Sequence, residues 1–137
     1  MQIDIDPLSE VPLYQQLRDR VVEGIASGLL PTGEQLASVR QLAVAFGINV
    51  ATVSKGYELL RHEGLIRTNH KSGSVIARGP ADGAARDGFA DEWRTRLTTL
   101  LAEAVAQGVT PAQISESVDC ILTGFTRKEQ STEGDRA

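Results

Sequence analysis

Residues 36–66 read LASVRQLAVAFGINVATVSKGYELLRHEGLI, and this stretch decides the fold. Ser38 stands three residues before Gln41, the spacing at which two such side chains can cap the first turn of a helix reciprocally. Gly47 lies where that helix would end, and glycine readily takes the positive φ that ends helices. The pattern therefore predicts a helix over about 39–46.

A second helix is expected within a few residues of the first. Asn49 is a good N-terminal cap, and the helix continues to about Glu63 because Gly64 then stops it. At about 100° per residue, one face of this helix would pack in the core and the opposite face would stay exposed. The expected core face holds Val53, Gly56, Tyr57 and Leu60, and the expected exposed face holds Ala51, Lys55, Glu58 and His62.

Upstream of this pair, a first helix is expected after Pro12, which suits the first turn of a helix. Its apolar residues recur at helical spacing until Gly28 closes the element. They are Leu13, Leu17, Val21 and Ile25. Pro31 and Gly33 then mark residues 29–33 as a connection.

Downstream, residues 65–69 and 74–78 are expected to form two short strands of a hairpin. The turn between them holds His70, Lys71, Ser72 and Gly73. Three helices, the second and third joined by a short glycine-containing turn, followed by a hairpin, form the plan of a winged helix-turn-helix. We expect this domain over residues 1–78, in a chain that is mainly α with a small β-hairpin.

The rest of the chain predicts a linker and two more helices. Residues 79–88 are small, glycine-rich and without apolar periodicity, as in linkers. Residues 89–127 hold two amphipathic segments, the second opened by a cap, a proline and a capping-box partner at Thr110, Pro111 and Gln113. Residues 128–137 are polar and are expected to be disordered. The apolar stripe of the two segments comprises Trp93, Leu97, Leu100, Leu101, Ala104, Ile114, Val118, Ile121, Leu122 and Phe125.

The start of the helix expected over 50–63 has the composition of a recognition helix. Its smaller side chains let the backbone approach a groove, and its polar ones can bond phosphates or base edges. The former are Val50, Ala51 and Ser54, and the latter are Asn49, Thr52, Ser54 and Lys55. A purely structural interpretation competes, because Asn and Ser are common at helix starts in any protein.

Charge is distributed unevenly along the chain. The whole sequence has a formal net charge of -4 and a pI of about 5.2. Residues 36–78, by contrast, carry six Lys or Arg side chains against two Glu, a net charge of +4. This basic block coincides with the expected DNA-reading half and favours a nucleic-acid partner, although an ordinary solvated face is the plainer alternative.

Length and composition exclude several classes of protein. The 137 residues leave no room for a large multidomain enzyme, and no apolar run approaches the ~18 residues that span a bilayer. The first residues are acidic, unlike a secretion signal, so we expect a cytoplasmic protein with no membrane partner. Cys120 and the two histidines have no metal-ligand spacing, and no nucleophile or phosphate-loop motif is present. We therefore expect no enzyme, metal or cofactor.

A series of spaced motifs runs through residues 11–78. They are Val11-Pro12-Leu13-Tyr14-Gln15-Gln16-Leu17, Gly28-Leu29-Leu30-Pro31-x-Gly33, Leu36-x-Ser38-x-Arg40-x-Leu42-Ala43 and Phe46-Gly47-Ile48-Asn49-x-x-Thr52-Val53-x-x-x-Tyr57-x-x-Leu60-x-x-x-Gly64-Leu65-Ile66. Together they resemble the amino-terminal DNA-binding domain of GntR-family bacterial transcription regulators. The following part resembles the YtrA subfamily, which appends a short two-helix region that mainly dimerises the protein.

The resemblance implies DNA contacts at the starts of the second and third helices and at the hairpin tip. The residues concerned are Ser38, Arg40, Asn49, Val50, Ala51, Thr52, Ser54, Lys55, His70, Lys71 and Gly73. The sequence departs from the family pattern at Ala37, where proline is usual, at Gly56, where alanine is usual, and in the wing at Asn69, His70 and Lys71.

Two hypotheses follow. The first is a sequence-specific repressor that acts as a homodimer on palindromic promoter DNA, with the apolar stripe as the dimer interface, because two isolated helices bury too little surface to order themselves. The second is a winged-helix architectural or protein-interaction module without operator specificity. The alternative to a dimer interface is that the stripe forms an internal hairpin packed on its own winged domain. A small-molecule effector is a further candidate partner, and the sequence does not identify it.

Overall fold

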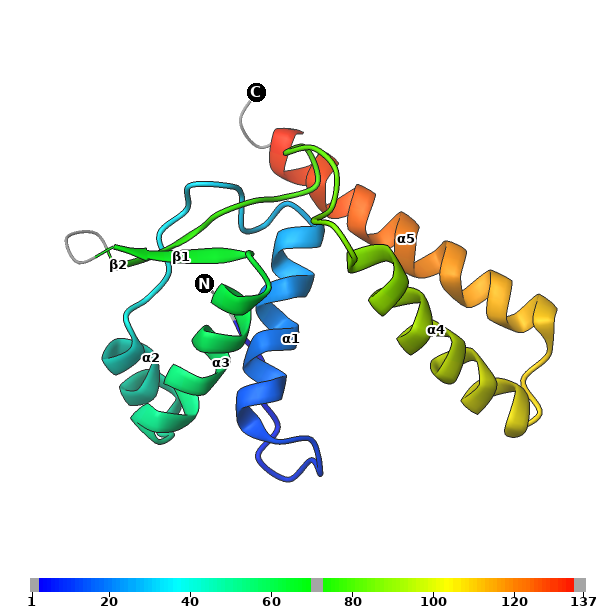
Figure 1. The fold of residues 1–137 in the computed structure, drawn as a ribbon, viewed down its shortest axis with the longest axis horizontal. Coiled ribbons are helices and arrows are strands. Elements are labelled where there is room, and N and C mark those ends of the chain that lie inside the picture. Colours follow the sequence, from blue (N-terminus) through cyan, green and yellow to red (C-terminus); the bar gives the residue numbers. More distant parts are fainter. Residues whose placement is uncertain (1–2, 70–72, 135–137) are drawn as a thin grey trace.

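The computed structural model describes residues 3–69 and 73–134. The first three helices and the hairpin form one cluster, and the two longer C-terminal helices form an antiparallel pair that extends to one side of it (Figure 1). The elements are α1 (Leu13–Ala26), α2 (Val39–Phe46), α3 (Val50–His62), β1 (Ile66–Asn69), β2 (Gly73–Ile76), α4 (Phe89–Ala106) and α5 (Pro111–Gly134). This confirms the winged helix-turn-helix followed by two helices. Of the helices described, none is both long and apolar enough to cross a membrane.

The core of the cluster lies between α1 and α3. Its fully buried residues include Leu17, Val21, Val53, Tyr57 and Leu60. The two helices approach closely at Gly56, where a Cβ atom would lie 3.0 Å from Leu17 Cδ2 and 3.1 Å from the Tyr14 carbonyl oxygen. The absence of a side chain at Gly56 therefore lets α1 and α3 pack at short range.

The boundaries of α2 and α3 follow the capping signals in the sequence. Ser38 Oγ accepts a hydrogen bond from Gln41 N–H at 3.1 Å, and Gln41 Oε1 accepts one from Ser38 N–H at 3.0 Å. Gly47 ends α2 with a φ of 64°, and Asn49 caps α3. The tight turn between the two helices is thus the one that the sequence predicts.

The hairpin is close to its expected position. The strands fall within the spans 65–69 and 74–78, except that Gly73 belongs to β2. The sequence pattern places Gly73 in the turn, but its backbone pairs with the last residue of β1. His70 and Lys71, the other proposed contact residues of the wing, lie outside the described residues.

A further segment, to which we assigned no strand, runs along the free edge of β2. Gln35 pairs with Val75 in an antiparallel bridge, and Leu36 N–H donates to the Ser74 carbonyl at 2.8 Å. The paired stretch is too short to show periodicity, and the nearby Gly33 favours a connection. The pairing ties the wing to the chain that leads into α2.

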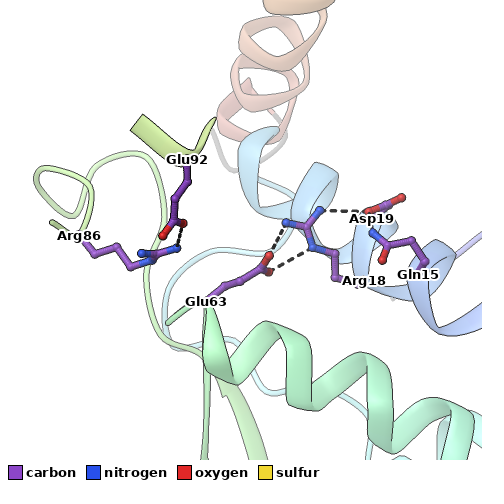
Figure 2. A network of polar contacts seen from close by, with 6 residues as sticks. All are labelled: Gln15, Arg18, Asp19, Glu63, Arg86 and Glu92. Atoms are coloured by element: carbon purple, nitrogen blue, oxygen red, sulfur yellow. Dashed lines mark hydrogen bonds and ion pairs between the residues drawn. The ribbon is translucent and has the colours of Figure 1, made fainter. Parts of the chain in front are cut away.

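A polar clamp joins α1 to the end of α3 (Figure 2). The Arg18 guanidinium donates two hydrogen bonds to Glu63, at 2.6 and 3.1 Å, and one to Asp19 at 3.0 Å. Partial burial acts to lower the pKa of Arg18, but the hydrogen bonds to the two carboxylates outweigh it and raise the pKa. Bidentate pairing of this kind is directional, so it fixes the orientation of the two helices.

Residues 79–88 contain neither helix nor strand, but their first half is anchored to the winged domain. The Asp82 carboxylate accepts hydrogen bonds from the Thr32 hydroxyl and from a backbone N–H of the segment, and both lower the pKa of Asp82. Arg78 donates to two carbonyl oxygens of the segment at 2.8 and 2.9 Å. Residues 85–88 lead on to α4, and Arg86 in this stretch donates a 2.7 Å hydrogen bond to Glu92 in the first turn of that helix (Figure 2).

The helices α4 and α5 are in contact and run antiparallel (Figure 1). The apolar stripe is divided between two environments. Leu97, Leu101, Ala104, Ile114 and Phe125 are half-buried. Trp93, Leu100, Val118, Ile121 and Leu122 are exposed. Pairing α4 with α5 therefore covers only part of the stripe.

The end of α5 differs from expectation. The helix continues to Gly134, so residues 128–134, which we expected to be disordered, are helical. Residues 127–130 read RKEQ, four good helix formers, and no proline interrupts the sequence before Gly134. Polar composition alone is thus a weak signal for the end of a helix that is already nucleated.

Candidate nucleic-acid interface

The outward face of α3 is free of the core, as the helical periodicity predicts. Ala51, Lys55, Glu58 and His62 are exposed, and Thr52 and Ser54 are half-buried. At the first turn, Val50 keeps 47% of its surface exposed. Small side chains at this end leave the α3 backbone accessible to a groove wall.

Two of the proposed contact residues already cap helices. Ser38 Oγ accepts the Gln41 N–H, and Asn49 Oδ1 accepts the Ala51 N–H at 2.7 Å. The structural interpretation is therefore correct for these acceptor atoms. The Ser38 hydroxyl hydrogen and the Asn49 amide NH₂ bond to no residue that the structure describes, so they can donate to phosphate oxygens, which are acceptors.

Arg40 lies in the first turn of α2 and is exposed. Its guanidinium has no hydrogen bond or ion pair to any residue in the described part of the chain. The backbone N–H groups of Val39 and Arg40 at the start of α2, and of Val50 at the start of α3, likewise lack partners among residues 3–69 and 73–134. Free N–H groups and an unpaired guanidinium together present donors to an anionic ligand.

Lys55 is placed differently from Arg40. Its ammonium group lies 4.0 Å from the centre of the Tyr14 ring, which belongs to α1. This cation–π contact restrains an otherwise flexible side chain while leaving the charge exposed. No local sequence pattern predicts the contact, because the two residues are far apart in the chain.

Tyr57 is a residue that sequence reasoning assigned only to the core. Its hydroxyl donates a 2.6 Å hydrogen bond to the carbonyl of Ala37, the residue before the α2 cap. Burial raises the pKa of Tyr57 to about 12. The bond ties the start of α2 to the middle of α3.

The wing is connected to α3 by side chains. Arg61 donates to the Thr68 hydroxyl at 3.2 Å, and this hydroxyl lies 3.0 Å from Ser74 Oγ across the hairpin. Arg67, on β1, is exposed and has no partner among the described residues. It is a cation of the wing that the sequence-based contact set omits, and its position in the basic block was the available signal.

A second surface lies on the two C-terminal helices. No residue of α4 is fully buried, and the exposed fractions of Trp93, Leu100 and Ile121 are 46%, 61% and 57%. A helix pair that leaves such side chains in water has an unsatisfied apolar face.

Comparison with known proteins agrees with the arrangement of α1, α2, α3 and the wing. Residues 13–76 match the family described as "Bacterial regulatory proteins, gntR family". The HTH-type transcriptional repressor YtrA of Bacillus subtilis (strain 168) is 33% identical over 114 residues, which cover 83% of this chain and 87% of YtrA. The chain belongs to the GntR family. Another relative of this GntR-family chain, the HTH-type transcriptional regulator Rv1152 of Mycobacterium tuberculosis, is 34% identical over 65% of the chain and 74% of its own length.

Two solved structures resemble the GntR-family chain beyond its winged domain. One, described as a transcriptional antiterminator from Listeria monocytogenes EGD-e, has a TM-score of 0.79 at 30% identity and covers 87% of this chain and 88% of its own. The other, YtrA from Sulfolobus acidocaldarius, a GntR-family transcription factor, has a TM-score of 0.58 at 35% identity and covers 76% and 97%.

Proposed function

We propose that this GntR-family protein is a sequence-specific DNA-binding transcription regulator that represses promoters as a homodimer on palindromic operators. The observation that carries the proposal is Arg40, an exposed cation with no partner in the described residues, at the start of the helix that precedes α3. A guanidinium in that position suits a guanine edge or a phosphate. The names of the relatives, a transcriptional repressor and a transcriptional regulator, support it.

The proposed contacts follow the two free helix starts and the wing. They comprise Ser38, Arg40, Asn49, Val50, Ala51, Thr52, Ser54, Lys55, His70, Lys71 and Gly73, with Arg67 added from its exposure on β1. The winged domain over 1–78 would bind DNA, residues 79–88 would connect, and residues 89–127 would dimerise. Such a regulator would act in the cytoplasm, where bacterial promoters lie.

The dimer is supported by the exposed half of the stripe. Five of its ten side chains stay in water after α4 and α5 have paired. A second copy of the chain would cover them in a four-helix core, which buries apolar surface at roughly 25 cal/mol per Å². Two DNA-binding domains in one particle also add their phosphate contacts, and an isologous pair reads a two-fold symmetric site.

The test is a fluorescence-anisotropy titration of the full chain with DNA from upstream of its own gene, beside a scrambled duplex of equal length, at two salt concentrations. A specific regulator should prefer its operator by a factor of ~10³ or more. Equal, salt-sensitive binding to both duplexes would contradict the proposal and favour the architectural module. A small-molecule effector, if one acts, would appear as a metabolite that changes this ratio.

A further inference from the structure

The start of α2 is held in place from another helix. Arg40 is only three residues from Ala37, and the Ala37 carbonyl accepts the 2.6 Å hydrogen bond from Tyr57 of α3. The Tyr57 side chain is 0% exposed. Because water has no access to this hydroxyl, the bond to Ala37 has no solvent substitute.

We propose that Tyr57 is a positioning residue for operator recognition, which acts through Arg40 by setting the place of the α2 start against α3. This inference rests on the proposed function. Tyr57 itself faces the core and touches no DNA in this scheme. Its hydroxyl joins the two elements that must contact the same duplex, so it sets where the backbone that carries Arg40 lies relative to α3.

The surrounding contacts explain why the hydroxyl matters locally. On one side of Ala37, Leu36 N–H is bonded to Ser74 of the wing at 2.8 Å. On the other side, α2 is anchored by its buried Leu42 and Ala43. Loss of the Tyr57 hydroxyl leaves the Ala37 carbonyl without this partner, and the chain between the two anchors would shift to reach water. Leu36 is itself part of the core and Ala37 and Val39 pack against it, so the comparison requires variants that are fully folded.

Loss of the Tyr57 hydroxyl should affect operator binding and non-specific DNA binding differently. Phosphate contacts tolerate small displacements because they are largely electrostatic, whereas base-edge hydrogen bonds require a defined geometry. A displaced Arg40 therefore weakens operator binding and leaves affinity for random DNA nearly unchanged. A general loss of stability would change neither, provided that both proteins stay folded.

The experiment compares Tyr57→Phe with Ser27→Ala at a temperature where circular dichroism shows every variant to be folded. Ser27 is a matched control because it is also buried and donates to a backbone carbonyl, that of Gly24 at 3.3 Å, at the far end of α1. We expect Tyr57→Phe to lose about fivefold to tenfold in operator affinity, little in random-duplex affinity, and Ser27→Ala to lose neither. In an Arg40→Ala background, the loss from Tyr57→Phe should fall below about twofold.

Equal losses in the two Arg40 backgrounds, or an unchanged operator affinity for Tyr57→Phe, would overturn the inference. Amide hydrogen exchange tests the positioning role of Tyr57 separately from the proposed function. Amide exchange over residues 36–41 should accelerate in Tyr57→Phe and not in Ser27→Ala. If the wild-type chain prefers no duplex, the proposed function fails, and unchanged exchange at 36–41 would refute the positioning role independently.

Discussion

Side chains at the proposed interface differ in how many of their polar atoms the fold already uses. Ser38 and Asn49 commit an acceptor oxygen to a helix cap, whereas Arg40 commits no donor to any described residue. Lys55 stands between them, with its ammonium group on the Tyr14 ring. Substitution of Ser38 or Asn49 therefore mixes stability with binding, and substitution of Arg40 isolates binding.

Arg40→Ala should weaken operator binding by about 1 to 3 kcal/mol if the guanidinium contacts a base, and thermal stability should stay unchanged because no internal partner is lost. Arg94→Ala is the matched control, since Arg94 is an exposed cation on α4. Anisotropy titrations with operator and random duplexes measure the DNA affinity of both variants. A uniform loss on all sequences would instead show a phosphate contact, and equal effects of the two variants would contradict the assignment.

The raised pKa of Tyr57 predicts that the folded chain loses stability at alkaline pH. Burial raises the pKa of Tyr57 to about 12 in the folded chain, against about 10 for an unfolded tyrosine. Between these values the unfolded chain has lost a proton that the native chain keeps, so the free energy of unfolding decreases as pH rises. Urea denaturation at several alkaline pH values should show a shallower decrease for Tyr57→Phe. An equal slope in the wild-type chain and in Tyr57→Phe would refute the expectation.

Local signals predicted these residues only in part. Periodicity assigned Tyr57 to the core face of α3 correctly, because burial depends on spacing within one helix. The hydroxyl bond to Ala37 and the Lys55 contact with Tyr14 join different elements. Their geometry follows from how α1, α2 and α3 pack, which no single stretch of sequence specifies.

At the scale of elements, caps and glycines set most helix boundaries, whereas local sequence does not predict which segments pair with each other. The Ser38 capping box and the Gly47 turn were predictable because both are short-range. The strand-like pairing of Gln35 with Val75 was not, since it joins segments far apart in the chain. The continuation of α5 to Gly134 follows the helix propensity of residues 127–130, whereas the polarity of the segment indicates disorder.

Replacement of glycine by alanine should change stability in opposite directions at two positions. Gly47→Ala forces a Cβ atom into a backbone with φ of 64°, which should cost about 1 to 2 kcal/mol. Gly124→Ala lies within α5 and meets nothing within 4 Å, so it should stabilise the helix by up to about 1 kcal/mol. Urea denaturation followed by circular dichroism checks both. Stabilisation by Gly47→Ala would contradict the left-handed turn.

At the scale of the whole molecule, the two halves of the chain differ in how completely they bury themselves. The winged domain has a closed core, whereas α4 and α5 leave Leu100 61% exposed. The sequence predicted the stripe but not which half of it would remain in water, because that depends on how the two helices pack on each other.

Leu100→Asp should convert the proposed dimer to monomers, because a carboxylate in an apolar interface has no partner. Thr98→Asp adds the same charge at an exposed polar position of α4 and should leave the mass unchanged. Light scattering measures the mass, and the fluorescence of Trp93, the single tryptophan, should shift to longer wavelength only in Leu100→Asp. A monomeric wild-type chain, or a dimer that survives Leu100→Asp, would reject the interface.

The bonds that Thr32 and Arg78 make to residues 79–84 shorten the free connection to α4. The remaining residues, 85–88, of which Arg86 is bonded to Glu92 of α4, reach at most about 14 Å when fully extended. In the proposed dimer, this short connection would limit how far each winged domain can move. Binding would therefore depend on the rotational position of the two half-sites around the DNA axis. Five extra base pairs between half-sites rotate one of them by about half a turn, to the far side of the duplex. Ten extra base pairs return the half-site to the same face of the duplex, but they separate the half-sites by more than the two connections can reach. Promoters would therefore tolerate substitutions between half-sites far better than insertions.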